Sequence, residues 1–119
     1  MDKINLQEKL DLFDEHWKPK IVGELNGQQV RLAKFKGEFV WHKHEAADEL
    51  FMVINGSFEM QFRDRIVTVE KGEFIIVPHG VEHCPRAAEE VHVMLFEPAD
   101  TLNTGDAESD RVVTDPERL

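Results

Sequence analysis

Two short stretches of the sequence decide the expected fold: residues 37–49, GEFVWHKHEAADE, and residues 72–83, GEFIIVPHGVEH. Side chains two residues apart on a strand point to the same face of the sheet. His42 and His44 are therefore expected to project together from one strand. The residues that follow them are enough to turn the chain, so the next apolar segment can bring the Glu49 carboxylate back beside the two imidazoles.

The second stretch predicts a turn followed by a new strand. Gly80 permits a tight turn, and His83 stands at the start of the strand, where its side chain can point inward. Three imidazoles and one carboxylate suit a divalent transition-metal ion such as Fe, Ni, Mn, Zn or Cu. We therefore predict one such ion, held by His42, His44, Glu49 and His83. A histidine must be neutral to bind a metal, so we expect metal affinity to fall below about pH 6.5.

The remaining candidate groups are weaker. A His-x-His pair alone is more often a surface feature than a metal site. Asp48 competes with Glu49 for the carboxylate position, but a carboxylate at a strand entry is usually solvated. His79 lies in a turn and His92 stands alone in an apolar strand, so both are expected to be non-ligands. Cys84 should face away from the preceding histidine and act as a small buried apolar residue.

Strand signals fill the chain from residue 20 to residue 97. The dipeptide Asn26-Gly27 between two apolar segments predicts a β-hairpin with a type I′ turn. Further strands are predicted over residues 38–44, 49–54, 57–62, 65–70, 73–77, 81–86 and 91–96. About eight or nine short strands, with turns every 8–12 residues, indicate an all-β sandwich or small barrel. The strand over 49–54 is apolar on both faces, so a second sheet, the N-terminal helix or another subunit must cover its outer face.

The segments that flank the barrel have a different character. Residues 5–16 predict a short helix, capped by Asn5 with Glu8 as its reciprocal partner. The last 23 residues hold seven acids and two arginines, and we expect them to drape over the surface or to be partly mobile. The predicted organisation is a helix and lead-in over 1–19, a barrel over 20–97 and an acidic tail over 98–119.

Composition excludes several classes of function. The chain has 119 residues, which suits one domain, and a formal net charge of −10, which argues against nucleic acid as a partner. No apolar run approaches the roughly 18 residues that cross a bilayer, so no membrane partner is expected. The single cysteine cannot form an internal disulfide, and the first residues do not form a secretory signal. We therefore expect a cytoplasmic protein.

The first stretch resembles the first motif of the cupin superfamily. That motif is a glycine, a His-x-His pair, a glutamate and a later glycine, which correspond here to Gly37, His42, His44, Glu49 and Gly56. One departure is visible, because four residues separate the first glycine from the first histidine where the family usually has five. This difference does not touch a ligand position and could shift the entry of the strand.

The second stretch resembles the second cupin motif. Gly72, Pro78, Gly80 and His83 follow its spacing throughout, whereas the asparagine that normally ends the motif is Ala87 here. The resemblance implies a jelly-roll barrel (a double-stranded β-helix) in a small single-domain cupin. It also implies a homodimer and a metal ion at the barrel centre, with the family's ligands falling on the four residues already chosen.

The resemblance and the predicted site suggest a metal-dependent enzyme that acts on a small polar organic molecule. Dioxygenase and isomerase or lyase chemistry both fit, and the alternative is a non-catalytic, metal-assisted binding or storage protein. A divalent ion beside one ionised carboxylate would leave the centre at about +1, so an anionic or enolisable substrate is reasonable. The sequence names no general acid or base, and it leaves no room for a helix-turn-helix beside the barrel.

Overall fold

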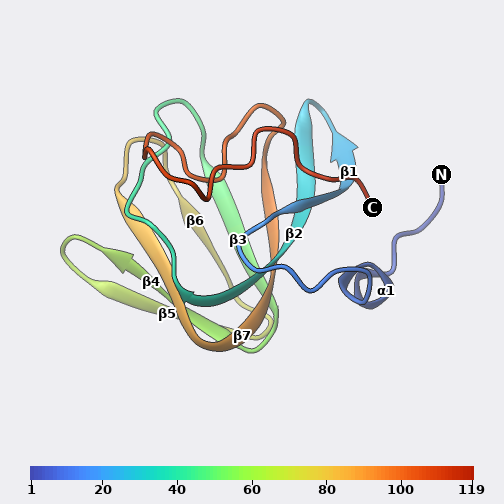
Figure 1. Ribbon diagram of the computed structural model, residues 1–119, viewed down its shortest axis with the longest axis horizontal. Helices are drawn as coiled ribbons and strands as arrows, with labels where there is room; N and C mark the ends of the chain where they lie inside the picture. The colour runs from blue at the N-terminus through green and yellow to red at the C-terminus, as the bar shows by residue number, and fades with distance from the viewer.

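Seven antiparallel strands curl into a barrel that is open at one end, with a short helix packed on its outside (Figure 1). This computed structural model describes all residues from 1 to 119. The elements are α1 (Leu6–Leu10), β1 (Lys20–Leu25), β2 (Gln28–Glu38), β3 (Glu49–Asn55), β4 (Ser57–Phe62), β5 (Ile66–Glu70), β6 (Phe74–Val77) and β7 (His83–Pro98). The predicted all-β jelly-roll class with a short N-terminal helix is confirmed.

Strand β7 joins the two halves of the barrel. The sheet order is β1-β2-β7-β3-β6, and β4 pairs both with β7 and with β5. Residues 83–86 of β7 pair with β4, whereas residues 91–98 pair with β2 and residues 92–96 also with β3. One strand of 16 residues therefore pairs with β2, β3 and β4 in a single sheet. No helix in the structure combines the length and the hydropathy needed to cross a bilayer.

The hairpin prediction is confirmed in detail. Asn26 and Gly27 both have positive φ angles, of 52° and 75°. A type I′ turn needs this conformation at both central positions, and asparagine and glycine tolerate it best. Leu25 and Gln28 face each other across the turn as the first pair of the β1–β2 ladder.

Two strand predictions are wrong. Residues 39–48 form a loop instead of the predicted strand 38–44, and their pairing with the sheet is reduced to one bridge between His42 and His83. The predicted strands 81–86 and 91–96 are a single strand, β7. The turn expected between them is replaced by an irregularity in the ladder, where β7 runs from Ala87 to Val91 while β2 runs only from Gly37 to Phe35. A bulge of this kind bends a strand without ending it.

The helix is shorter than predicted. Its start is as expected, because the side chain of Asn5 accepts a hydrogen bond from the backbone N–H of Glu8 at 3.0 Å. It ends at Leu10 instead of residue 16. The ammonium group of Lys34 donates to the carbonyl oxygens of Leu10 and Phe13, at 2.9 Å and 2.6 Å, and so takes up carbonyls that a longer helix would use internally.

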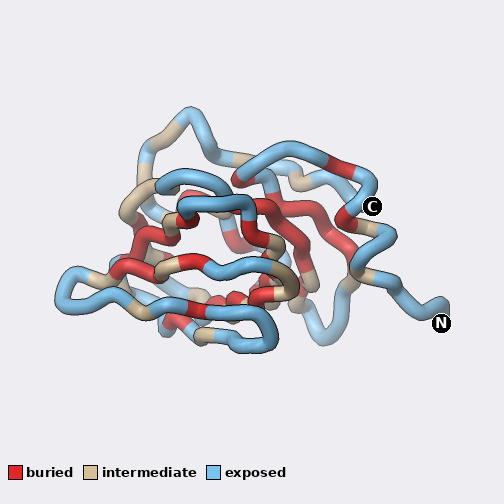
Figure 2. The backbone as a smooth tube through the Cα atoms, turned by 90° about the horizontal axis from the view of Figure 1, so that it is seen from below, coloured by how far each residue is buried: buried red, intermediate tan, exposed pale blue.

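Apolar side chains form two separate cores. The larger one fills the barrel and includes Val53, Phe58 and Val93. Figure 2 shows the buried stretches of the backbone in the middle of the molecule. The smaller one lies outside the barrel, where Leu10 and Phe13 pack near Ile54 and Met94. The helix therefore covers part of the outer face of β3 and β7.

The residues after β7 run back over the barrel. This segment, residues 99–119, is called the C-terminal strap below. It crosses above the open end of the barrel, coloured red in Figure 1, before its last residues meet β1. There Ile21 donates its N–H to the Glu117 carbonyl at 2.8 Å and accepts from the Leu119 N–H at 3.0 Å.

Candidate metal centre

The structure brings all four predicted ligands together at one end of the barrel interior. His42, His44, Glu49 and His83 are each at most 7% exposed. Their ligand atoms lie within 4.8 Å of one another. The Nε2 atoms of His44 and His83 lie 3.1 Å and 3.7 Å from the same carboxylate oxygen, Oε1 of Glu49. Residues that are up to 41 positions apart in the sequence thus converge on a single point.

Regular strands carry two of these side chains, and a loop carries the other two. Glu49 begins β3 and His83 begins β7. His42 is tied to His83 by two backbone hydrogen bonds, of 3.0 Å and 2.9 Å. His44 accepts a hydrogen bond from the N–H of Gly80 at 2.8 Å. The turn of the second motif therefore also holds the loop of the first motif in place.

Backbone carbonyls fix the ring orientation of two of the histidines. The Nδ1 atoms of His42 and His83 lie 2.9 Å from the carbonyl oxygens of Val40 and Val81. A carbonyl only accepts hydrogen bonds, so each Nδ1 carries the proton and each Nε2 keeps a free lone pair. Metal-binding histidines are usually held in this way.

Several polar atoms of the cluster have no hydrogen-bond partner, as expected if a metal ion binds there. Nε2 of His44, Nε2 of His83 and Oε1 of Glu49 are fully buried and make no hydrogen bond. Buried polar atoms without partners are rare and cost about 1–3 kcal/mol each. A single divalent cation would coordinate all three, and this donor set suits the transition metals predicted from the sequence.

Burial also sets the charge state of the cluster. It lowers the pKa of His42 to about 4, and the neighbouring His83 adds to the effect. The loss of metal affinity below about pH 6.5 stays a prediction, and the lowered pKa of His42 moves proton competition at this one ligand toward pH 4. Burial alone would raise the pKa of Glu49, but the adjacent Glu97, His44 and His83 side chains hold it well below its usual value.

Glu97 is a site residue that was not predicted, since the sequence analysis only counted it among the acids of the last 23 residues. It lies in β7, is 1% exposed and pairs through Oε1 with Nη1 of Arg31 at 2.9 Å. Burial and the nearby Glu49 carboxylate raise the pKa of Glu97 well above its usual value. The Arg31 guanidinium opposes this rise, because it favours the ionised carboxylate. Glu97 has the same strand parity as Val91, Val93 and Leu95, and this parity was the signal that could have placed it on the inner face.

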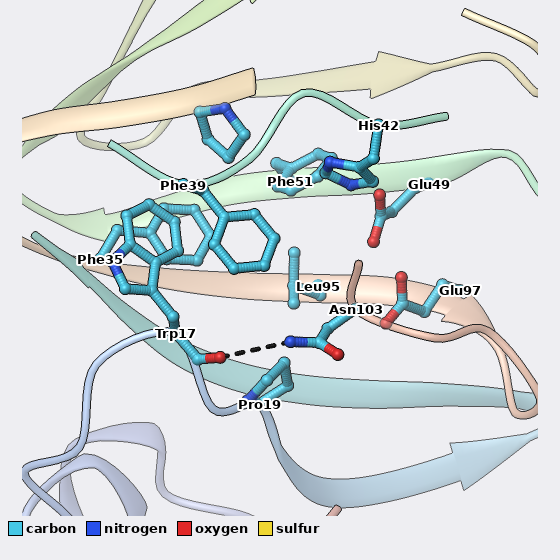
Figure 3. A pocket seen from close by; sticks show the side chains of 11 residues that line it. Trp17, Pro19, Phe35, Phe39, His42, Glu49, Phe51, Leu95, Glu97 and Asn103 are labelled. Carbon is cyan, nitrogen blue, oxygen red and sulfur yellow. Dashed lines mark hydrogen bonds between the residues drawn. The ribbon is translucent and has the colours of Figure 1, made fainter. Parts of the chain in front are cut away.

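A narrow cavity leads to the cluster, and four aromatic side chains, Trp17, Phe35, Phe39 and Phe51, form part of its wall (Figure 3). The indole of Trp17 stacks on the rings of Phe35 and Phe39, with centroid distances of 4.5 Å and 4.7 Å. Asn103 of the C-terminal strap reaches the same cavity and donates to the Trp17 carbonyl at 3.4 Å. The free volume is about 20 Å³, close to that of one water molecule.

The groups that the sequence analysis set aside lie outside the cluster. Asp48 is exposed and accepts hydrogen bonds from the backbone N–H and Nδ1 of His79, both at 2.9 Å. His92 contacts Asn55 and Glu90. Cys84 is buried, and burial raises the pKa of its thiol to about 11, as expected for an unreactive cysteine.

Comparison with known proteins identifies the family. The family model for the cupin domain matches residues 28–97, which is more than half of the chain. The protein belongs to the cupin family. This cupin is similar to a cupin-2 domain containing protein from Shewanella frigidimarina, with 45% sequence identity and a TM-score of 0.79, over 80% of this chain and 93% of that one.

Two other relatives are informative. Protein NMB1881 from Neisseria meningitidis is 31% identical, with a TM-score of 0.76, over 82% of this cupin and 100% of that chain. The uncharacterized protein YdbB from Bacillus subtilis is 39% identical over 67 residues, which are 56% of this cupin. The matched region spans 59% of the length of YdbB.

The pKa of His42 predicts how the stability of the metal-free protein depends on pH. The unfolded chain binds a proton near pH 6.5, whereas folded His42 binds it only near pH 4. The unfolded state is therefore favoured as the pH falls through this window, by on the order of 3 kcal/mol. Urea unfolding in EDTA between pH 7 and pH 4 should show this loss. His42→Asn, which keeps a donor for the Val40 carbonyl, should lose less stability over the same range; an equal loss would contradict the assignment.

Proposed function

We propose that this cupin binds one divalent transition-metal ion through His42, His44, Glu49 and His83 and acts as a metal-dependent enzyme on a small organic molecule. The observation that carries the proposal is the convergence of buried, unpartnered ligand atoms on one point at the end of a cavity. Four protein ligands leave one or two coordination positions for water or substrate. Oxygenase and isomerase or lyase chemistry are both compatible with such a centre.

The residues around this centre have different roles. A bound ion would supply Lewis acidity or redox chemistry. Phe39, Phe51 and Leu95 line the cavity and exclude water from it. The carboxyl group of Glu97 lies beside Glu49 and also lines the cavity, so it is placed to contact a substrate or a water molecule.

The cavity also supports a substrate class. Its apolar wall and its polar end favour a compact molecule with an apolar body and one oxygen or sulfur group that can bind the metal. An anionic or enolisable group suits a centre with a local charge of about +1. The cavity holds about one water molecule, so a larger substrate requires the wall to move on entry.

Metal content tests the site assignment directly. Untagged wild-type protein, loaded separately with Fe(II), Ni(II), Mn(II) and Zn(II) and then desalted, should retain about one ion per chain of at least one metal by elemental analysis. The double variant His42→Ala/His83→Ala removes two ligands and should retain less than about a tenth of that amount. His79→Ala removes an exposed histidine and is the matched control, with circular dichroism to check folding. Retention of metal by the double variant would refute the site.

Turnover separates the enzyme from the alternative, a non-catalytic binding or storage protein. We expect the Fe(II)-loaded protein to consume dioxygen with at least one compound from a panel of diketones, catechols and thiols, or the Zn(II)- or Mn(II)-loaded protein to convert a member of a sugar panel. His42→Ala/His83→Ala should abolish either activity. A ligand-induced thermal shift without turnover on any panel would favour the binding protein instead.

A homodimer is the second part of the proposal. Five side chains form two cross-strand rows on the outside of the sheet and are named the outer apolar face here: Leu50, Met52, Phe74, Ile76 and Phe96. Phe74 and Ile76 are 59% and 53% exposed, because α1 covers only the neighbouring Ile54 and Met94. A second copy can cover this face with the same face of its own, as two-fold dimers do.

Light scattering coupled to size exclusion measures the mass of the assembly. The wild-type protein should have twice the chain mass of 13.8 kDa. Phe74→Lys/Ile76→Lys places two charges in the interface and should give the monomer mass, since a buried unpaired charge costs several kcal/mol. Leu12→Lys alters an equally exposed residue away from this face and should leave the dimer intact. A monomeric wild type would refute the dimer.

A further inference from the structure

The loop that carries the first two candidate ligands is bonded to the C-terminal strap. Lys43, between His42 and His44, donates its backbone N–H to Oδ1 of Asp106 at 2.8 Å. Its carbonyl oxygen accepts the backbone N–H of Asp106 at 3.1 Å. One strap residue thus satisfies both backbone polar groups of the residue that joins the two histidines. A neighbouring strand would normally provide these partners, but none lies on this side of the loop.

The preceding residue of the strap packs directly on the first ligand. A Cβ atom at Gly105 would lie 2.3 Å from the Lys43 carbonyl oxygen and 3.0 Å from Cδ2 of His42. The first distance is far shorter than a van der Waals contact, and the atom it meets belongs to the backbone. Any side chain here would therefore push the loop, and the imidazole of His42 with it.

The strap is itself anchored just before this contact. Arg31, which pairs with Glu97, also donates to the carbonyl oxygens of Ala99 and Thr101, both at 3.0 Å. Thr104 is 1% exposed. The same buried guanidinium therefore holds the carboxylate beside the cluster and the first residues of the strap. A rigid strap can in turn fix the loop.

We propose that Gly105 and Asp106 are positioning residues of the metal centre, which hold the backbone of residues 42–44 so that the two imidazoles meet Glu49 and His83. This inference rests on the proposed metal site. Groups that orient metal ligands typically contribute tenfold to a hundredfold to metal affinity. Asp106 acts on the two histidines indirectly, through its hydrogen bonds to the backbone of Lys43. Gly105 acts because it has no side chain that would collide with the Lys43 carbonyl oxygen.

Metal affinity and coordination geometry provide the first test. Co(II) affinity, measured by competition with a chelator, should fall by about tenfold to a hundredfold in Asp106→Ala and in Gly105→Ala. At saturating Co(II) their visible absorption spectra should differ from that of the wild type, because the imidazoles are displaced. Asp106→Asn keeps an oxygen acceptor for the Lys43 N–H and should restore both properties. Asp115→Ala removes an exposed strap carboxylate and should change neither.

Hydrogen exchange of the metal-free protein provides the second test and does not depend on the proposed function. The backbone amide of Lys43 should exchange at least tenfold faster in Asp106→Ala than in the wild type and in Asp106→Asn. If the wild type binds no metal, the proposed function fails, and this measurement still decides whether the strap holds the loop. Unchanged exchange, or unchanged Co(II) affinity and spectrum in Asp106→Ala, overturns the inference. If Asp106→Ala does not fold, Gly105→Ala is used for both measurements.

Discussion

Desolvation of the ligand cluster is the constraint on which the rest of the site depends. Three imidazoles and a carboxylate lie in the interior of the barrel, where each unpartnered polar atom carries a cost that water would otherwise remove. The structure reduces this cost where it can, through the carbonyls of Val40 and Val81, which accept from two of the rings. Three of the buried atoms left without hydrogen-bond partners, Nε2 of His44, Nε2 of His83 and Oε1 of Glu49, lie at the common centre. A cation at this centre would supply the partner that these atoms lack.

Arg31 is a second buried polar group whose desolvation must be compensated, and its partners lie both beside the cluster and in the C-terminal strap. It is a fully buried charge, and such a charge is tolerated only with complete compensation. Glu97, Gln29 and the first carbonyls of the strap supply it. Glu97 in turn lies against Glu49, so Glu97 and Arg31 together connect Glu49 to the C-terminal strap.

The fold was largely predictable because its determinants are local. The Asn26-Gly27 turn, the cap at Asn5 and the alternation in β3 each depend on residues within one short segment. The candidate ligands were predictable from the spacing of the two motifs, although His42 and His44 lie in a loop and not on the strand whose periodicity was used to pair them. The break predicted near residues 86–90 was wrong because a bulge bends β7 there without ending it, and the compensating change lies in β2, about 50 positions earlier in the chain.

The sequence by itself determined the strand class, the hairpin, the cupin motifs and the four residues that could bind a metal. Only the tertiary structure showed that Glu97 is buried beside Glu49, that Trp17 helps to close the cavity, and that Asp106 replaces a strand as the partner of Lys43. The physical reason is the range of each interaction. Periodicity and turn chemistry act over a few residues, whereas burial and the pairing of Lys43 with Asp106 join segments 63 positions apart and depend on the path of the whole chain.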